Sequence, residues 1–160
     1  MERNAYELYK KDDWQCIIGH AGFIKTAEDL YEAMASAAPS VKFGLAFVEA
    51  SGERLVRYEG NDSELIDAAK KNALGIAAGH TFIILFTGAF PINVINAVRS
   101  VPEVSEIFCA TANKVQVVTV STDLGKAVIG VVDGQTCIGA EDEEHIKQRR
   151  ELLKKLGYKP

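Results

Sequence analysis

The segment 79-GHTFIILFTGAFP-91 decides the fold that this sequence predicts. Its core, Thr81–Phe86, is almost wholly apolar and is bounded by Gly79 and Gly88. A short apolar run between glycines is typical of a strand that is buried on both faces. Pro91 suits the first turn of a following helix, whose inward positions would be Ile92, Ile95 and Val98. The segment therefore predicts a central strand joined to a covering helix.

The rest of the chain alternates further apolar runs with capping and turn residues. The runs predict strands at Trp14–Gly19, Val41–Ala50, Arg54–Tyr58, Ser105–Ala110, Val115–Ser121 and Lys126–Val132. Helices are expected from Thr26, which would form a capping box with Asp29, from Asn61 or Asp62, and from Glu141 to about Lys155. Gly157 would end the last helix. Ser51-Gly52 predicts a hairpin between its two flanking strands.

These elements predict an α/β fold with a mixed, largely parallel β-sheet and helices packed on its faces. Two strands joined through the Pro91 helix would run parallel with a right-handed crossover. No linker, repeat or change in composition divides the chain. We therefore expect a single domain over residues 1–160.

Composition and charge exclude several classes of protein. The net charge of −4 argues against nucleic-acid binding, which normally needs a basic face. No apolar run approaches the roughly 20 residues of a membrane helix, and Met1–Asn4 has no signal-like apolar segment. A cytoplasmic protein is expected. Three widely spaced cysteines fit neither a metal site nor a disulfide framework, so we expect Cys16, Cys109 and Cys137 to be buried.

Polar residues follow several of the predicted strands. In parallel α/β sheets, ligands bind at the carboxyl ends of strands, beside helix N-termini. Lys25 would supply a cation for phosphate there, and amides could read a purine edge or ribose hydroxyls. The expected ligand-binding residues are Lys25, Asn93, Asn96, Thr111, Asn113 and Asp133. Asn113 and Asp133 could instead serve only their own turns.

His20 and His80 are the candidate catalytic residues for proton or phosphoryl chemistry. His20 would lie at the same sheet edge as the predicted ligand-binding residues. His80 begins its strand and would lie about 20 Å from Asn93, at roughly 3.3 Å per strand residue. It could join the pocket only across a subunit interface, or if the strand directions differ from those expected. His145, on an acidic helix, is expected to have no chemical role.

Familiar nucleotide-binding and catalytic motifs are absent from the sequence. There is no G-x-x-x-x-G-K-[ST] phosphate loop, no G-x-G-x-x-G fingerprint and no protein-kinase signature. There is also no G-x-S-x-G elbow and no His/Cys spacing typical of metal sites. Nucleotide binding or phosphoryl transfer would therefore need a site that none of these motifs describes.

Long ordered strings resemble the adenosine-specific kinase family, which is mainly archaeal and thermophilic. They include 23-FIKT-26, 41-VKFGLAF-47, 56-VRYEGND-62, 78-AGHTF-82, 107-IFCATAN-113 and 130-GVVDG-134. The resemblance covers about residues 14–158. It implies an α/β domain that binds adenosine or AMP, forms a homo-oligomer and could act as a phosphotransferase. The resemblance also implies that family members often have a histidine at the position of Gly22, for which His20 could substitute. If phosphoryl transfer depends on that histidine and His20 does not replace it, this chain would bind the nucleoside without catalysing transfer.

Two other functions remain open at this point. One is a non-catalytic oligomeric protein with a regulatory or interaction role, which would show no selectivity for nucleosides. The other is a hydrolase of a small phosphorylated metabolite that uses His20 or His80. No motif in the sequence identifies a cofactor or a phosphate donor.

Overall fold

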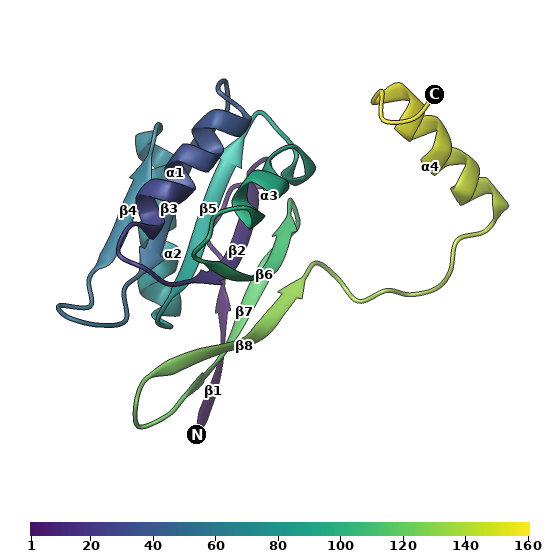
Figure 1. The fold of residues 1–160 in the computed structure, drawn as a ribbon. Helices are drawn as coiled ribbons and strands as arrows, with labels where there is room; N and C mark the ends of the chain where they lie inside the picture. The colour runs from purple at the N-terminus through teal and green to yellow at the C-terminus, as the bar shows by residue number, and fades with distance from the viewer.

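The computed structural model describes residues 1–160, which form eight strands and four helices (Figure 1). The strands are β1 Glu2–Glu7, β2 Gln15–Ala21, β3 Lys42–Val48, β4 Val56–Gly60, β5 Thr81–Thr87, β6 Val104–Thr111, β7 Val115–Ser121 and β8 Lys126–Asp133. The helices are α1 Thr26–Ala37, α2 Ser63–Ile76, α3 Pro91–Arg99 and α4 Glu143–Lys155.

The strands form two sheets, and every pairing in both sheets is antiparallel. The larger sheet has the order β4-β3-β5-β2-β6, with β5 at its centre. The smaller sheet has the order β1-β7-β8. The central position of Thr81–Phe86 is thus confirmed, and the expected largely parallel sheet is wrong.

The expectation was wrong because each helical connection skips one position in the sheet. Strands β5 and β6 run in the same direction, as expected for strands joined through α3, but β2 lies between them and runs the opposite way. In the same manner, α1 connects β2 to β3 around β5, and α2 connects β4 to β5 around β3. A helical connection predicts the relative direction of two strands; it does not predict whether they are neighbours.

The smaller sheet combines an expected hairpin with an unexpected strand. Strands β7 and β8 pair through the turn that the sequence predicted at residues 122–125. Strand β1 pairs with β7 from Glu2↔Ser121 to Glu7↔Gln116. Its sequence, ERNAYE, has no strong apolar alternation and is mostly exposed, so the strand depends on the backbone edge that β7 offers.

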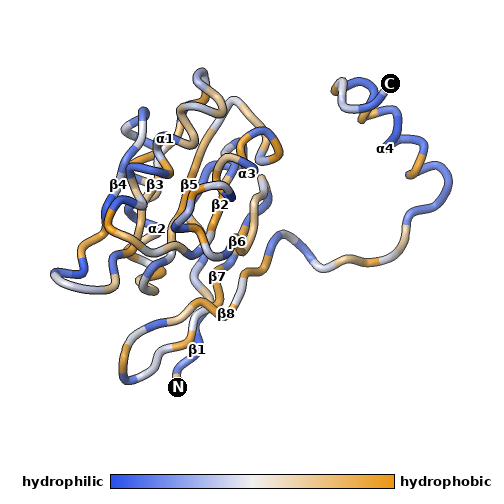
Figure 2. The backbone as a smooth tube through the Cα atoms, viewed as in Figure 1, coloured by the Kyte–Doolittle hydropathy of each residue, from blue (hydrophilic) through white to orange (hydrophobic).

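Helices α1 and α3 cover one face of the larger sheet, whereas α2 and the smaller sheet cover the other. The first layer buries Phe43, Phe47, Phe82 and Phe86. The second buries Ile18, Ile83 and Leu85, and Figure 2 shows the hydrophobic strands between these layers. Helix α2 packs so closely on β3 that a Cβ atom at Gly44 would lie 2.2 Å from the backbone of Ile66. Only glycine permits this contact.

The start of α2 and the end of α4 are capped as predicted, whereas the start of α1 is not. The Asp62 side chain accepts a hydrogen bond from the Leu65 N–H and caps α2, and Gly157 adopts a φ of 81° after α4. Thr26 does not form the predicted capping box. Its Oγ1 instead donates to the Phe23 carbonyl oxygen, at 2.7 Å, and accepts from the Phe23 N–H, which holds the chain just before α1.

The C-terminal part of the chain differs from the rest. Residues 134–142 contain no helix or strand, and they lead to α4, which stands apart from the two sheets (Figure 1). Cys137 lies in this segment and is exposed, contrary to expectation, whereas Cys16 and Cys109 are buried as expected. None of the helices combines the length and apolar character that crossing a membrane requires.

Candidate functional site

The antiparallel pairing of β2 and β5 brings the two candidate catalytic histidines together. His20, near the end of β2, pairs with Thr81 at the start of β5, next to His80. The imidazole centroids of His20 and His80 lie 5.8 Å apart. His80 was expected at the opposite edge of the sheet from His20 because the strands were assumed to be parallel. This expectation is wrong, and the strand directions differ in the way that allows His80 to lie beside His20.

The backbone of His80 is held in an unusual conformation. Its φ is +64°, in the left-handed region that non-glycine residues seldom adopt. The His80 N–H donates to the Val48 carbonyl oxygen at 2.7 Å, and the His80 carbonyl accepts from the Ala21 N–H at 2.9 Å. Its ring stacks on Phe47, with centroids 5.6 Å apart. Backbone strain that is fixed from several sides is frequent at functional sites.

Glu49 and Arg57 extend the histidine pair towards β3 and β4. His80 Nε2 lies 3.7 Å from one carboxylate oxygen of Glu49, and Nη2 of Arg57 lies 3.5 Å from the other. The Ala50 N–H donates to Glu49, and this bond, with the nearby Arg57 charge, lowers the pKa of the carboxyl group. Arg57 also donates from Nη1 to the Ile24 carbonyl oxygen at 2.6 Å. A fixed anion therefore lies beside the His80 ring.

His20 has one ring nitrogen engaged and one without a hydrogen bond. Its Nδ1 lies 2.8 Å from Oγ of Ser105, and that hydroxyl donates its proton to the His20 carbonyl oxygen. In the tautomer in which Nδ1 donates to the Ser105 hydroxyl, the lone pair of the neutral ring is on Nε2. Burial, followed by the charge of His80, lowers the pKa of His20. A neutral imidazole with a free Nε2 can accept a proton or attack an electrophile.

A cavity of about 860 Å³ opens beside His80, between the start of α1 and the loop between β3 and β4. Glu49 and Arg57 line it, together with several large side chains that are otherwise exposed. These large side chains are Phe23, Ile24, Leu55 and Tyr58. Six of the 16 residues that line the cavity are hydrophobic and most of the others are polar or charged, so it offers both apolar contact and hydrogen-bonding groups to a small molecule.

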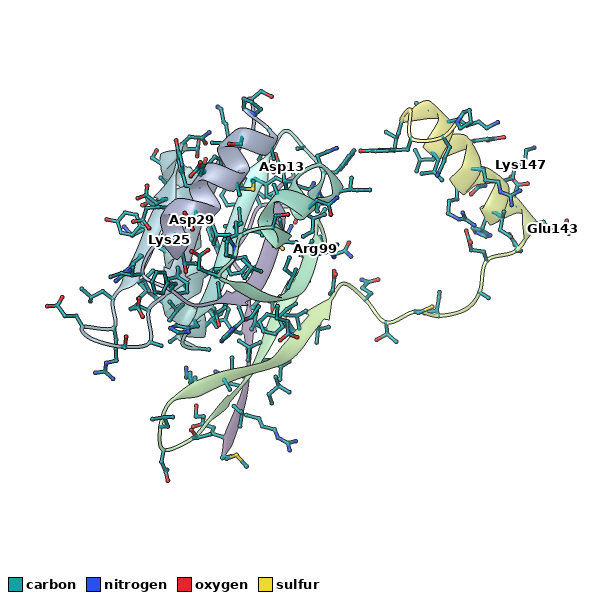
Figure 3. All side chains as sticks on the ribbon, in the orientation of Figure 1. Asp13, Lys25, Asp29, Arg99, Glu143 and Lys147 are labelled. Atoms are coloured by element: carbon teal, nitrogen blue, oxygen red, sulfur yellow. The ribbon has the colours of Figure 1, made fainter.

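Lys25 does not line this cavity. Its ammonium group contacts Asp29 and lies 2.9 Å from Glu103 Oε1, and Figure 3 shows Lys25 beside Asp29 at the start of α1. These two carboxylates raise the pKa of Lys25. The side chain of Glu103 is only 5% exposed, so Lys25 neutralises a nearly buried anion.

The other predicted ligand-binding residues lie away from His20 and His80. Asn93, near the start of α3, accepts a hydrogen bond from the Phe90 N–H, and Asn96 lies one turn later. Thr111 pairs with Cys16 at the start of β2, and Asn113 donates to Asp133 at 3.0 Å. The structure thus joins Asn113 with Asp133 but does not gather all six residues in one pocket. Their roles as ligands stay predictions.

Glu49 and Arg57 were not among the site residues predicted from the sequence. Glu49 follows β3, and Arg57 lies in β4 opposite Phe47, so the predicted hairpin already placed them near one another. What could not be foreseen was that β3 also pairs with β5, which brings this hairpin against His80. No group of three or more His, Cys, Asp or Glu side chains is arranged to hold a metal ion.

Comparisons with known proteins agree with this architecture. The profile of the family described as adenosine specific kinase matches residues 6–159. The crystal structure of the PH1918 protein from Pyrococcus horikoshii OT3 is 45% identical to the chain, with a TM-score of 0.96, and the match covers 99% of this chain and 98% of that one. No curated protein sequence is significantly similar. The family match spans nearly the whole chain, and the chain therefore belongs to the adenosine-specific kinase family.

Proposed function

We propose that the chain binds adenosine or AMP in the cavity beside His80 and transfers a phosphoryl group to the nucleoside. Family membership supports the choice of substrate and reaction. The observation that carries the proposal is that His80 lines this cavity together with Arg57 and Glu49, with the His20 ring 5.8 Å behind it. A volume of about 860 Å³ lies within the range of roughly 300–1,000 Å³ common for small-molecule sites.

In the proposed reaction, the P–O bond to the leaving group of a phosphate donor breaks, and a new P–O bond forms to a hydroxyl of adenosine. His80 accepts the hydroxyl proton, and the ionised Glu49 beside it stabilises the resulting imidazolium. Arg57 has five N–H donors, and its contacts with Ile24 and Glu49 leave some of them for phosphoryl oxygens. Positioning and charge stabilisation supply most of the catalysis of phosphoryl transfer.

His20 has a supporting role in this proposal. Its lowered pKa keeps the ring neutral near pH 7, partly because a protonated His80 disfavours a second positive charge. A positive charge on His80 therefore disfavours a second positive charge on His20 during the reaction. The resemblance implies a histidine at the position of Gly22, which has no side chain here. The His80 ring lies against this position, and His20, with its ring centroid 5.8 Å from that of His80, is the second imidazole nearby.

Calorimetric titration with adenosine, AMP and ATP tests the binding claim. Wild type should bind adenosine or AMP, and His80→Asn should lose transfer activity while keeping its backbone, since asparagine tolerates positive φ. His145→Asn, the same change on the exposed helix α4, is the matched control and should behave as wild type. No heat with any of the three compounds would overturn the proposal.

Incubation with a labelled phosphate donor, followed by mass measurement of protein and products, tests the reaction. Labelled AMP would support transfer to adenosine. Labelled free phosphate without AMP would indicate a hydrolase, and binding without any product would indicate a non-catalytic protein. Either of these two results would contradict phosphoryl transfer.

A further inference from the structure

Helix α4 has no packing partner within its own chain. None of its residues is buried, and the hydrogen bonds of its side chains are made within residues 141–149. Its end is linked to the remainder by an aromatic contact between Tyr158 and Phe90, with ring centroids 6.5 Å apart. Isolated helices shorter than about 12–15 residues are marginal in water. A 13-residue helix in this setting needs a surface to pack on.

One side of α4 carries the apolar side chains for such packing. Ile146, Leu152, Leu153 and Leu156 are spaced to share one helix face. Leu152 is 54% exposed and Leu156 is 50% exposed. Ile138, in the extended segment before α4, is fully exposed, and Figure 2 shows hydrophobic positions along this otherwise polar part of the chain.

The Pyrococcus horikoshii crystal structure holds this arm in the same position. A TM-score averages over the whole chain, so displacement of residues 134–160 would prevent a value of 0.96 with 99% coverage. An arm with almost no contact to its own sheets would not keep one position in two proteins that differ at more than half of their residues. A surface outside the chain must hold it, and that crystal structure is described as one protein alone.

The distribution of charge indicates what this surface is. Residues 147–159 contain six of the 18 basic residues and one of the 22 acidic residues. Residues 1–133, the body of the chain, contain 17 acidic and 12 basic residues, and the four remaining acidic residues, at positions 141–144, lie at the start of the arm itself. Figure 3 shows Glu143 and Lys147 on α4, well separated from α1 and α3. The basic end of the arm is complementary to the acidic body of another copy.

We propose that the arm, residues 134–160, crosses to a second copy of this chain and packs the apolar face of α4 on its surface. Each copy then donates one arm and receives another, as in assemblies built by exchange of an identical element. Ile129 and Val132 of β8, which precedes the arm, are also exposed apolar side chains. This inference does not depend on the proposed enzymatic function.

Sedimentation and light scattering of the full chain over a range of concentrations test the exchange. Wild type should have a multiple of the 17.4 kDa chain mass. Leu153→Lys should raise the concentration at half-dissociation by at least about tenfold, as loss of a central apolar contact does. Glu151→Gln changes the net charge equally but lies on the opposite face of α4, so it should leave assembly unchanged. A monomeric wild type, or equal effects of both variants, would overturn the proposal.

Amide hydrogen exchange shows whether the arm itself is in the interface. The amides of α4 should be protected in the assembled wild type and should exchange rapidly after dilution, or in Leu153→Lys, while β5 remains protected. An oligomer whose α4 amides exchange freely would refute the exchange. So would a monomer that binds vesicles of anionic lipid through its basic helix.

Discussion

Replacing Gly22 by alanine places a methyl group against the ring of His80. The new Cβ would lie 2.6 Å from Nδ1 and 2.9 Å from Cε1, whereas ordinary contacts begin at 3.4 Å. The ring must therefore retreat by about 0.8 Å. A misplacement of about 1 Å at a reacting group can cost on the order of 100-fold in rate. We expect phosphoryl transfer to fall by about this factor.

The same substitution should have little effect on the stability of the fold. Overpacking costs about 1–3 kcal/mol, and the smaller entropy of an unfolded alanine chain returns about 0.4–1 kcal/mol. His80 is 35% exposed and stacks on one face of Phe47, so part of the overlap can be relieved towards solvent. With about 2–4 °C per kcal/mol for a chain of this size, the melting temperature should drop by at most about 10 °C.

Single-turnover transfer to adenosine, measured beside thermal unfolding, separates the two effects. Gly125→Ala is the matched control, because its new methyl group would have no atom within 4 Å and its backbone is not in the left-handed region. It should retain wild-type transfer. Unchanged transfer in Gly22→Ala, or an equal loss in both variants, would refute the role assigned to the His80 ring.

Three further substitutions test the surroundings of the site and the core. Lys25→Ala leaves the nearly buried carboxylate of Glu103 without a cation. Calorimetry should therefore show a lower melting temperature, and a second change, Glu103→Gln, should restore it. Loss of adenosine affinity without a change in melting temperature would instead favour a ligand-binding role for Lys25. The pKa of His20 is lowered in the folded chain, so the unfolded chain binds a proton at this residue more readily, and stability is lost as pH falls below about 6.5. The loss of melting temperature with falling pH should be smaller in His20→Gln. The same pH dependence of melting in wild type and variant would contradict this contribution of His20. Asn72→Ala removes the hydrogen-bond partners of the Tyr9 N–H and carbonyl oxygen. The free energy of unfolding, measured with denaturant, should fall by about 2–4 kcal/mol. A fall of less than about 0.5 kcal/mol would contradict the importance of these two hydrogen bonds.

Local signals in the sequence predicted the elements well. The apolar run Thr81–Phe86 predicted the central strand, and Asp62 predicted the start of α2. Ser51-Gly52 predicted the hairpin connection between β3 and β4. Each of these signals acts within a few residues, through burial, capping or turn geometry. The family resemblance carried the inference about function, which the residues alone left open between a binder, a hydrolase and an interaction protein.

The arrangement of the strands could not be predicted in the same way. Neighbours in the sheet depend on contacts between segments far apart in sequence, such as His20 with Thr81. Once β2 was assumed to run parallel to β5, Lys25 and Asn113 were expected at one edge, although they lie near opposite ends of β2. The histidine pair results from the same long-range pairing. Helix α4 was predicted correctly as a helix, but no local signal says that its apolar face lacks a partner within the chain.

A crystal structure of the chain soaked with adenosine tests the central claim most directly. We predict nucleoside density in the cavity, with a hydroxyl within hydrogen-bonding distance of a His80 ring nitrogen and the base near Tyr58 or Phe23. Density beside the Asn113–Asp133 pair, with the His80 cavity empty, would contradict the proposed site.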